Sequence, residues 1–165
     1  MTFTEPYGKP HIGTKDMIDF TLEQDIDRPV GAVFVHVTDP ALLATWQTNT
    51  VSCEQEGDGP LGLGTRLHEV HSGPGGRQFP SVVEVSEFDP GRVFALRVVE
   101  GTPVHLRMSF TPLEHGTRVS FRVHGELGGL KRLVLAPVLK RQFSQQLGTL
   151  KSVLEQLDPV AERVC

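Results

Sequence analysis

The stretch that decides the fold is residues 130–157, LKRLVLAPVLKRQFSQQLGTLKSVLEQL, which follows Gly128-Gly129. Its second half repeats apolar residues in steps of four, three, four and three, a spacing that places one apolar stripe along an α-helix. A helix of this length with a wide apolar face needs an equally long surface to pack against, and the rest of the chain should supply it. The stripe consists of Phe143, Leu147, Leu150, Leu154 and Leu157.

Seven segments before this helix alternate apolar and polar residues, as half-buried strands do. They are residues 16–27, 51–56, 65–72, 77–88, 93–100, 104–110 and 118–124. Residues 29–37 and 41–46 are expected to form two short helices, because Pro29 and Asp39-Pro40 are typical of helix starts. Short turns join consecutive strands. The sequence therefore predicts an α+β helix-grip architecture: a curved seven-stranded antiparallel sheet around the long C-terminal helix, with two short helices closing one end.

The chain length of 165 residues is that of one domain. Residues 16–158 are expected to form it, between a flexible leader rich in proline and glycine at 1–15 and a C-terminal tail at 159–165. Pro137 lies near the start of the long helix. It either bends or restarts that helix, which would tune the opening of a cavity, or it marks a helix boundary.

Charge and composition exclude several classes of function. The net charge of -4 gives no basic surface for nucleic acid, and Lys131, Arg132, Lys140 and Arg141 are interpreted as a solvated helix face. No apolar run reaches the length of a membrane span and no apolar signal core precedes the domain, so we expect a cytoplasmic protein without membrane insertion. Two cysteines, Cys53 and Cys165, do not make a disulfide framework.

Two motifs that suggest cofactors are set aside. Gly57, Gly59 and Gly62 match G-x-G-x-x-G, but a dinucleotide site needs a helix directly afterwards, and an alternating strand follows instead. His68 and His71 resemble a shortened zinc-protease motif, but on a strand they point to opposite faces. We therefore expect neither an organic cofactor nor a metal.

Several short motifs resemble the START/Bet v 1-like (SRPBCC) superfamily, in particular its polyketide cyclase/dehydrase and lipid-transport branch. The resemblance covers roughly residues 17–157 and implies the helix-grip fold. It also implies activities that range from cyclisation and dehydration of aromatic polyketides to binding of lipids, sterols and hormones, with catalytic residues that vary between members. The motifs are Trp46, Gly62-Leu63-Gly64-Thr65-Arg66, the run from Glu84 to Arg92, Gly116-Thr117-Arg118 and Leu135-Ala136-Pro137.

The candidate catalytic residues are Glu69 and His71. The period of two places them on one face of their strand with Leu67, roughly 7 Å apart along it. If Leu67 faces a cavity, the carboxylate and the imidazole line it together and can serve as general base and acid. The alternative is that both lie on the solvent face or at a frayed strand end.

Apolar positions of the strands and of the long helix are the candidate ligand-binding residues. Trp46 either fills the core or stacks on a ligand at the cavity mouth. Polar residues of the last three strands form a stripe expected on the convex side, unless the registers are reversed and they line the cavity for an anionic substrate. This stripe comprises Arg97, His105, Arg107, Arg122 and His124. The candidate ligand-binding residues are Trp46, Leu67, Val83, Leu96, Met108, Phe110, Phe121, Phe143 and Leu147.

These features favour a cofactor-independent polyketide cyclase/dehydrase-like protein that holds a hydrophobic or aromatic molecule in an internal cavity. The alternative is a non-catalytic carrier or sensor of a lipid or another small hydrophobic ligand, and a third reading is a stabilising partner for another chain. The sequence leaves open whether the protein is an enzyme, and whether it is a monomer or a homodimer.

Overall fold

The computed structural model describes residues 17–157. The predicted leader and tail lie outside the described residues. The described chain forms seven strands and three α-helices, with 3-10 turns at Pro40–Leu42 and Pro74–Gly76. The elements are β1 (Met17–Ile26), α1 (Val30–Thr38), α2 (Leu43–Trp46), β2 (Thr50–Gln55), β3 (Arg66–Ser72), β4 (Gln78–Asp89), β5 (Val93–Glu100), β6 (Val104–Pro112), β7 (Thr117–Glu126) and α3 (Leu130–Gln156).

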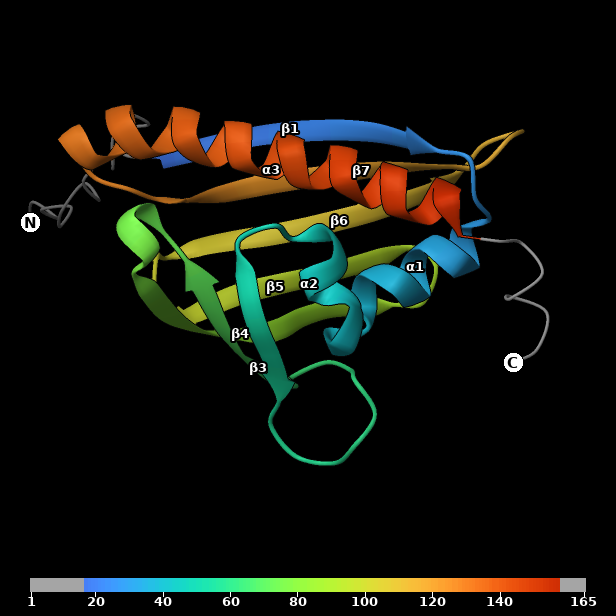
Figure 1. Cartoon of the computed structure of the whole chain (residues 1–165), viewed down its shortest axis with the longest axis horizontal. Helices are drawn as coiled ribbons and strands as arrows, with labels where there is room; N and C mark the ends of the chain where they lie inside the picture. The colour runs from blue at the N-terminus through green and yellow to red at the C-terminus, as the bar shows by residue number, and fades with distance from the viewer. Residues whose placement is uncertain (1–16, 158–165) are drawn as a thin grey trace, which may run out of the picture.

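The seven strands form one sheet in the order β1-β7-β6-β5-β4-β3-β2, and every neighbouring pair is antiparallel. Consecutive strands from β2 to β7 are therefore neighbours, while β1 joins the far end of the sheet beside β7. The long helix α3 runs along β1 and β7, and α1 and α2 lie on the same side of the sheet (Figure 1). This arrangement confirms the predicted helix-grip fold.

The two faces of the sheet differ as the alternation predicts. On β7, Val119, Phe121 and Val123 are buried toward the helices, whereas the residues between them point to the convex face. The convex residues form cross-strand ion pairs, which compensate their charges at the surface. The predicted polar stripe is thus on the convex side, and the alternative of a charged cavity lining is wrong. The pairs are Arg97–Glu84, Arg107–Glu87, Arg118–Asp25 and Arg122–Asp19.

The hairpin between β6 and β7 explains two residues of the motif Gly116-Thr117-Arg118. Gly116 has a φ of +97°, and a Cβ there would overlap the carbonyl oxygen of Ile26. Only glycine fits such a position. Thr117 is fully buried and donates a hydrogen bond to the carbonyl of Arg28 at 2.8 Å. These contacts fix the end of β1 against the hairpin.

The helix α3 continues without interruption through Pro137, so the predicted helix boundary at this proline is wrong. A proline inside a helix leaves the carbonyl four residues earlier without its amide donor. That carbonyl belongs to Leu133, and both residues lie on an exposed part of the helix. Because water can reach the free carbonyl, the helix tolerates the proline there.

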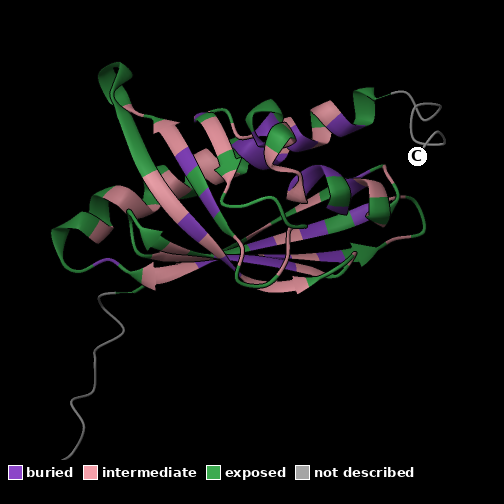
Figure 2. Cartoon of the chain, turned by 90° about the horizontal axis from the view of Figure 1, so that it is seen from below, coloured by how far each residue is buried: buried purple, intermediate pink, exposed green. Residues whose placement is uncertain are grey.

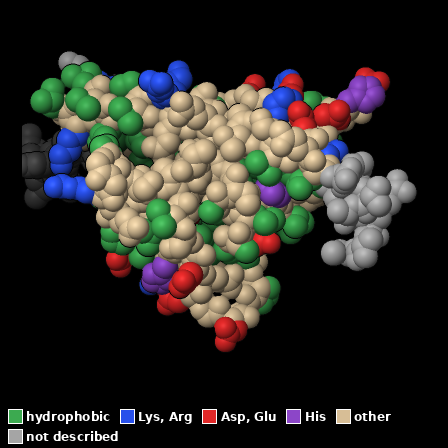
Figure 3. All heavy atoms as spheres, in the orientation of Figure 1, with side chains coloured by type: hydrophobic (Ala, Val, Ile, Leu, Met, Phe, Trp, Pro, Cys, Tyr) green, Lys and Arg blue, Asp and Glu red, His purple; other side chains and the backbone are tan. Residues whose placement is uncertain are grey.

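The two halves of α3 differ in burial. Leu147, Leu150 and Leu154 are buried against the sheet and Phe143 is partly buried, as the apolar stripe predicts. Leu157, the last residue of the predicted stripe, lies just after the helix and is exposed, so the prediction is wrong there. In the first half, four large apolar residues are exposed instead, and Figure 2 shows this end of the helix in the colours of exposed and intermediate residues. Figure 3 shows hydrophobic side chains gathered at the same end, beside Lys and Arg. The exposed residues are Leu130, Leu133, Val134 and Val138.

Candidate functional site

The inner face of β3 carries an acid–base pair. Leu67 and Glu69 are 1% and 6% exposed, so this face of the strand points into the protein as the hypothesis required. Oε2 of Glu69 lies 3.1 Å from Nε2 of His71, with side chains 7% and 25% exposed. The solvent-face alternative is therefore wrong for this pair, although His71 does lie near the end of its strand, as the last residue but one of β3. A carboxylate and an imidazole in contact at the edge of an apolar core can exchange a proton with a bound molecule.

Hydrogen bonds behind His71 hold the ring in place. The Thr50 hydroxyl donates to Oε1 of Gln47 at 2.8 Å and lies 3.4 Å from Nδ1 of His71. The His71 ring is thus held between Thr50 on one side and Glu69 on the other.

Cys53 lies opposite Glu69 in the register of β2 and β3. Burial, and then the charges of Glu69 and Glu54, raise the pKa of the Cys53 thiol to about 12. A thiol with such a pKa stays protonated near neutral pH and is a poor nucleophile. Cys53 therefore contributes packing to the site, and Glu69 and His71 remain the candidate proton-transfer groups there.

A buried amide from α3 completes the polar part of this region. Gln146 is 2% exposed, and its side-chain nitrogen donates to Oδ1 of Asn49 at 2.6 Å. Gln146 is not among the site residues predicted from the sequence. Its spacing, three residues after Phe143 and four before Leu150, is the signal that places it on the buried stripe. Nearby in sequence, Trp46 is also buried, and its indole Nε1 has no hydrogen-bond partner among the described residues.

The candidate ligand-binding residues come together in one apolar cluster. Eight of the nine are buried, and Phe143 packs at the margin of the cluster, edge-on to Phe121 with ring centroids 4.9 Å apart. The cluster joins the inner face of the sheet to α2 and to the second half of α3. That a ligand contacts these residues stays a prediction, because they pack against one another and line neither of the two pockets described next.

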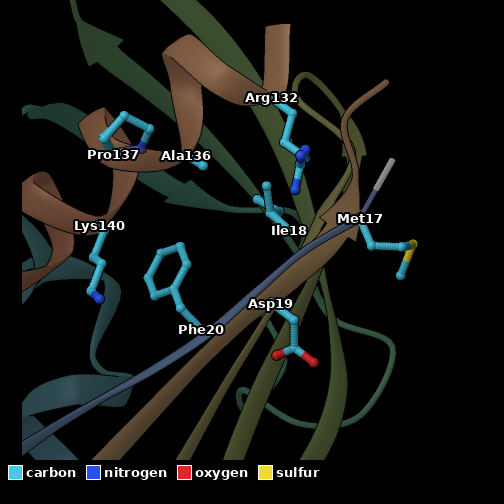
Figure 4. A pocket seen from close by; sticks show the side chains of 8 residues that line it. All are labelled: Met17, Ile18, Asp19, Phe20, Arg132, Ala136, Pro137 and Lys140. Carbon is cyan, nitrogen blue, oxygen red and sulfur yellow. The ribbon is translucent and has the colours of Figure 1, made fainter. Parts of the chain in front are cut away.

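A pocket of about 260 Å³ opens between the start of β1 and the first half of α3. In Figure 4, Ile18 and Phe20 extend from β1 toward the helix, which contributes Ala136 and Arg132. The buried Nε of Arg132 has no hydrogen-bond partner among residues 17–157. The walls are thus mostly apolar with cationic groups at one side. The lining residues are Met17, Ile18, Asp19, Phe20, Arg132, Ala136, Pro137 and Lys140.

The single carboxylate in this lining, that of Asp19, is engaged elsewhere. It accepts hydrogen bonds from Nε and Nη2 of Arg122 at 2.9 and 2.6 Å, and the hydrogen bond from Arg122 lowers the pKa of the Asp19 carboxyl. Arg132 and Lys140 are therefore not neutralised by Asp19. An amphiphile with an apolar body and an anionic end matches this pocket chemically.

A second pocket, of about 520 Å³, lies between the β1–α1 turn and the β6–β7 hairpin. Arg28, which lines it, donates from Nε to the carbonyl of Leu154 at 2.7 Å and so serves to fix the end of α3. His68 lies on the outer side of β3 with Glu56, 3.3 Å away, so His68 and His71 point to opposite faces as predicted. Among residues 17–157 no group of three His, Cys, Asp or Glu side chains could hold a metal ion.

The order of the strands and the position of α3 define a helix-grip protein. The family model described as "Polyketide cyclase / dehydrase and lipid transport" matches residues 17–155, and the chain belongs to this family. A search of the curated proteins found no significant match.

Solved structures at low sequence identity share the fold. Protein NE0264 from Nitrosomonas europaea is 20% identical with a TM-score of 0.71, over 88% of this chain and 97% of that one. Ara h 8.0201 is 15% identical with a TM-score of 0.68, over 84% and 97%. The di-domain ARO/CYC StfQ from the steffimycin biosynthetic pathway is 14% identical with a TM-score of 0.73, over 86% of this chain and 52% of StfQ.

Proposed function

We propose that this protein binds a hydrophobic or aromatic small molecule on the inner side of its sheet and promotes its cyclisation or dehydration with Glu69 and His71. The observation that carries the proposal is the contact between these two side chains on the inner face of β3. Family membership supports it, because cyclisation and dehydration are among the activities in the family's description. The structural likeness to the ARO/CYC protein supports a shared fold and does not by itself support a shared activity.

The pair has the groups that an aldol cyclisation needs. Oε2 of Glu69 contacts His71, which leaves Oε1 to remove a proton from a carbon between two carbonyls. The resulting carbanion attacks a second carbonyl, a carbon–carbon bond forms, and the new alkoxide takes the proton held on His71. Dehydration reverses the roles: His71 takes an α-proton, the protonated Glu69 gives its proton to the hydroxyl, and water departs, which returns both groups to their starting states.

The test compares two Glu–His pairs, each of which contains a histidine of β3. Glu69→Gln/His71→Asn removes the inner pair, and Glu56→Gln/His68→Asn removes the exposed pair on the outer face. With aromatic polyketide analogues that contain enolisable 1,3-dicarbonyl groups, we expect the inner double variant to lose at least about 100-fold in rate. The outer double variant should retain the wild-type rate. Equal rates for both variants would exclude the pair from catalysis.

One observation favours the carrier or sensor as a second candidate. The pocket beside Arg132 and Lys140 does not include Glu69 or His71 in its lining, so a molecule bound only there would not meet the acid–base pair. Native mass spectrometry of the purified protein distinguishes the two. The carrier would be favoured if the native protein holds a hydrophobic molecule that is released on denaturation. In that case Arg132→Gln should abolish binding of this molecule, and Glu69→Gln should not.

A further inference from the structure

The first half of α3 presents an apolar face to the outside of the molecule. Leu130, Leu133, Val134 and Val138 are 77%, 64%, 60% and 54% exposed. At about 100° per residue they fall, with Pro137, within an arc of roughly 140° on one side of the helix. Spacing of i, i+3, i+4 and i+8 makes this a continuous stripe, which we call the outer arc (Leu130, Leu133, Val134, Pro137 and Val138).

The opposite side of the same turns is apolar as well. Leu135, Ala136 and Leu139 are partly buried and pack against the core. A helix that is apolar on both sides is ordinarily buried all round, yet none of the described residues covers the outer arc. Exposed apolar patches of this kind mark a surface that meets another apolar phase.

The charged side chains on the helical turns that carry the outer arc are all positive. From Leu127 to Leu154 the sequence contains no acidic residue, although the whole chain has a net charge of -4. Lys131 and Lys140 fall at the two edges of the outer arc, at about 100° per residue. Long aliphatic stems ending in ammonium groups allow such flanking lysines to reach an anionic layer while the arc enters an apolar one.

These charges also select among the possible occupants of the outer arc. A second copy of the chain would bring the same lysines and arginines against one another without a carboxylate to compensate them, which disfavours self-association. A protein groove is usually anchored by aromatic side chains, whereas the outer arc is aliphatic and proline, and Arg141 adds a positive charge one turn further along the same side of the helix. An anionic lipid surface satisfies both the apolar arc and its cationic edges.

We propose that residues 130–141 dock on the surface of an anionic lipid bilayer, with α3 parallel to the membrane plane. The proposal concerns adsorption, since no helix within the described residues is long and apolar enough to cross a membrane. Ala136, Pro137 and Lys140 belong both to this segment and to the pocket of Figure 4. Docking would therefore hold the mouth of that pocket near the bilayer, where hydrophobic ligands accumulate.

Vesicle flotation of the full chain tests the proposal. The protein should float with vesicles of phosphatidylcholine mixed with phosphatidylglycerol, and far less with phosphatidylcholine alone or at high salt. Leu133→Gln/Val138→Gln should weaken partitioning about tenfold, because two apolar side chains no longer enter the bilayer. The matched control Leu63→Gln/Val35→Gln alters residues that are 75% and 63% exposed elsewhere on the surface and should bind as the wild type does.

A charge pair and a reporter complete the test. Lys131→Gln/Lys140→Gln should weaken binding to the anionic vesicles about tenfold, whereas Arg77→Gln/Arg92→Gln should not. The natural Trp46 is buried and the sequence contains no other tryptophan. Val134→Trp should therefore report insertion by a blue shift of its emission with anionic vesicles, and Val35→Trp should show none.

Three results would overturn the proposal. The wild type does not bind the anionic vesicles, or the control variants lose as much binding as the arc variants, or the wild type is a dimer that Leu133→Gln/Val138→Gln converts to a monomer. The last result would assign the outer arc to a second copy. Circular dichroism and thermal unfolding of each variant establish that it is folded. None of these results depends on whether Glu69 and His71 are catalytic.

Discussion

Both halves of α3 carry a stripe of apolar side chains at helical spacing, but the stripe of the second half is buried and the outer arc of the first half is exposed. In the second half, Leu150 and Leu154 are 0% and 1% exposed, whereas Leu133 in the first half is 64% exposed. Both halves would be assigned to the core from their spacing alone. The difference shows that periodicity identifies the apolar face of a helix but does not determine whether the rest of the protein covers this face.

Polar contacts hold the C-terminal end of α3 against the sheet. The side chain of Glu155 accepts the backbone N–H of Asp27 at 2.9 Å, and Lys151 donates to the carbonyl of Asp25 at 2.9 Å. Arg28 donates to the carbonyl of Leu154. The second half of α3 is thus fastened to the end of β1 and the turn after it, while the first half lies over the pocket lined by Arg132.

The largest expected effect in this comparison is on folding stability. Leu150→Ala should destabilise the protein by about 3 kcal/mol, because it leaves a cavity at a fully buried position. Leu133→Ala should change the free energy of unfolding by less than about 0.5 kcal/mol, as at other exposed sites. Urea unfolding at equilibrium measures both. Similar losses for the two variants would mean that the first half of α3 is covered in solution.

A smaller effect is expected where the buried half of α3 carries a polar group. Gln146→Ala leaves Oδ1 of the half-buried Asn49 without its donor, and the loss of this hydrogen bond should cost about 1 kcal/mol. The adjacent Gln145→Ala, at an exposed position, is the matched control and should have little effect. A double-mutant cycle with Asn49→Ala isolates the hydrogen bond. A coupling energy near zero would contradict the role assigned to this contact.

Much of the fold follows from local pattern. Alternation identified all seven strands, and it placed Leu67, Glu69 and His71 on the inner face of β3, because side chains of a strand alternate strictly between its two faces. The N-cap at Asp39 was also local: its side chain accepts the N–H of Ala41 at 2.9 Å. Such features depend on neighbours within a few residues, which a sequence displays directly.

The rest of the site depends on residues far apart in the chain. The partners Asn49 and Gln146 are separated by 97 positions, and Thr50 and His71 by 21. No periodicity connects such residues; they meet because the order of the strands brings α2, β2 and α3 together. The continuation of α3 through Pro137 could not be predicted for the same reason. It depends on the exposure of Leu133 to solvent, which only the tertiary structure determines.

The smallest expected effect concerns the fastening of α3 in acid. A backbone hydrogen bond from Asp27, and then one from Lys151, lower the pKa of the Glu155 carboxyl below its ordinary 4.5. In the unfolded chain this carboxyl takes up its proton at a higher pH. Its stabilisation is therefore complete above about pH 4.5 and is lost as the pH falls through the lower pKa of the folded state.

Glu155→Gln should therefore reduce the loss of stability between pH 5 and pH 3, by less than about 1 kcal/mol because the contact lies at the surface. Urea unfolding at a series of pH values measures the slope. Part of it should remain in the variant, because arginine partners also lower the pKa values of Asp19, Asp25 and Glu84. Glu155→Gln should bind vesicles as the wild type does, because residue 155 lies outside the docking segment 130–141. An unchanged slope would show that Glu155 does not fasten the helix, and the fastening would then rest on Lys151 and Arg28.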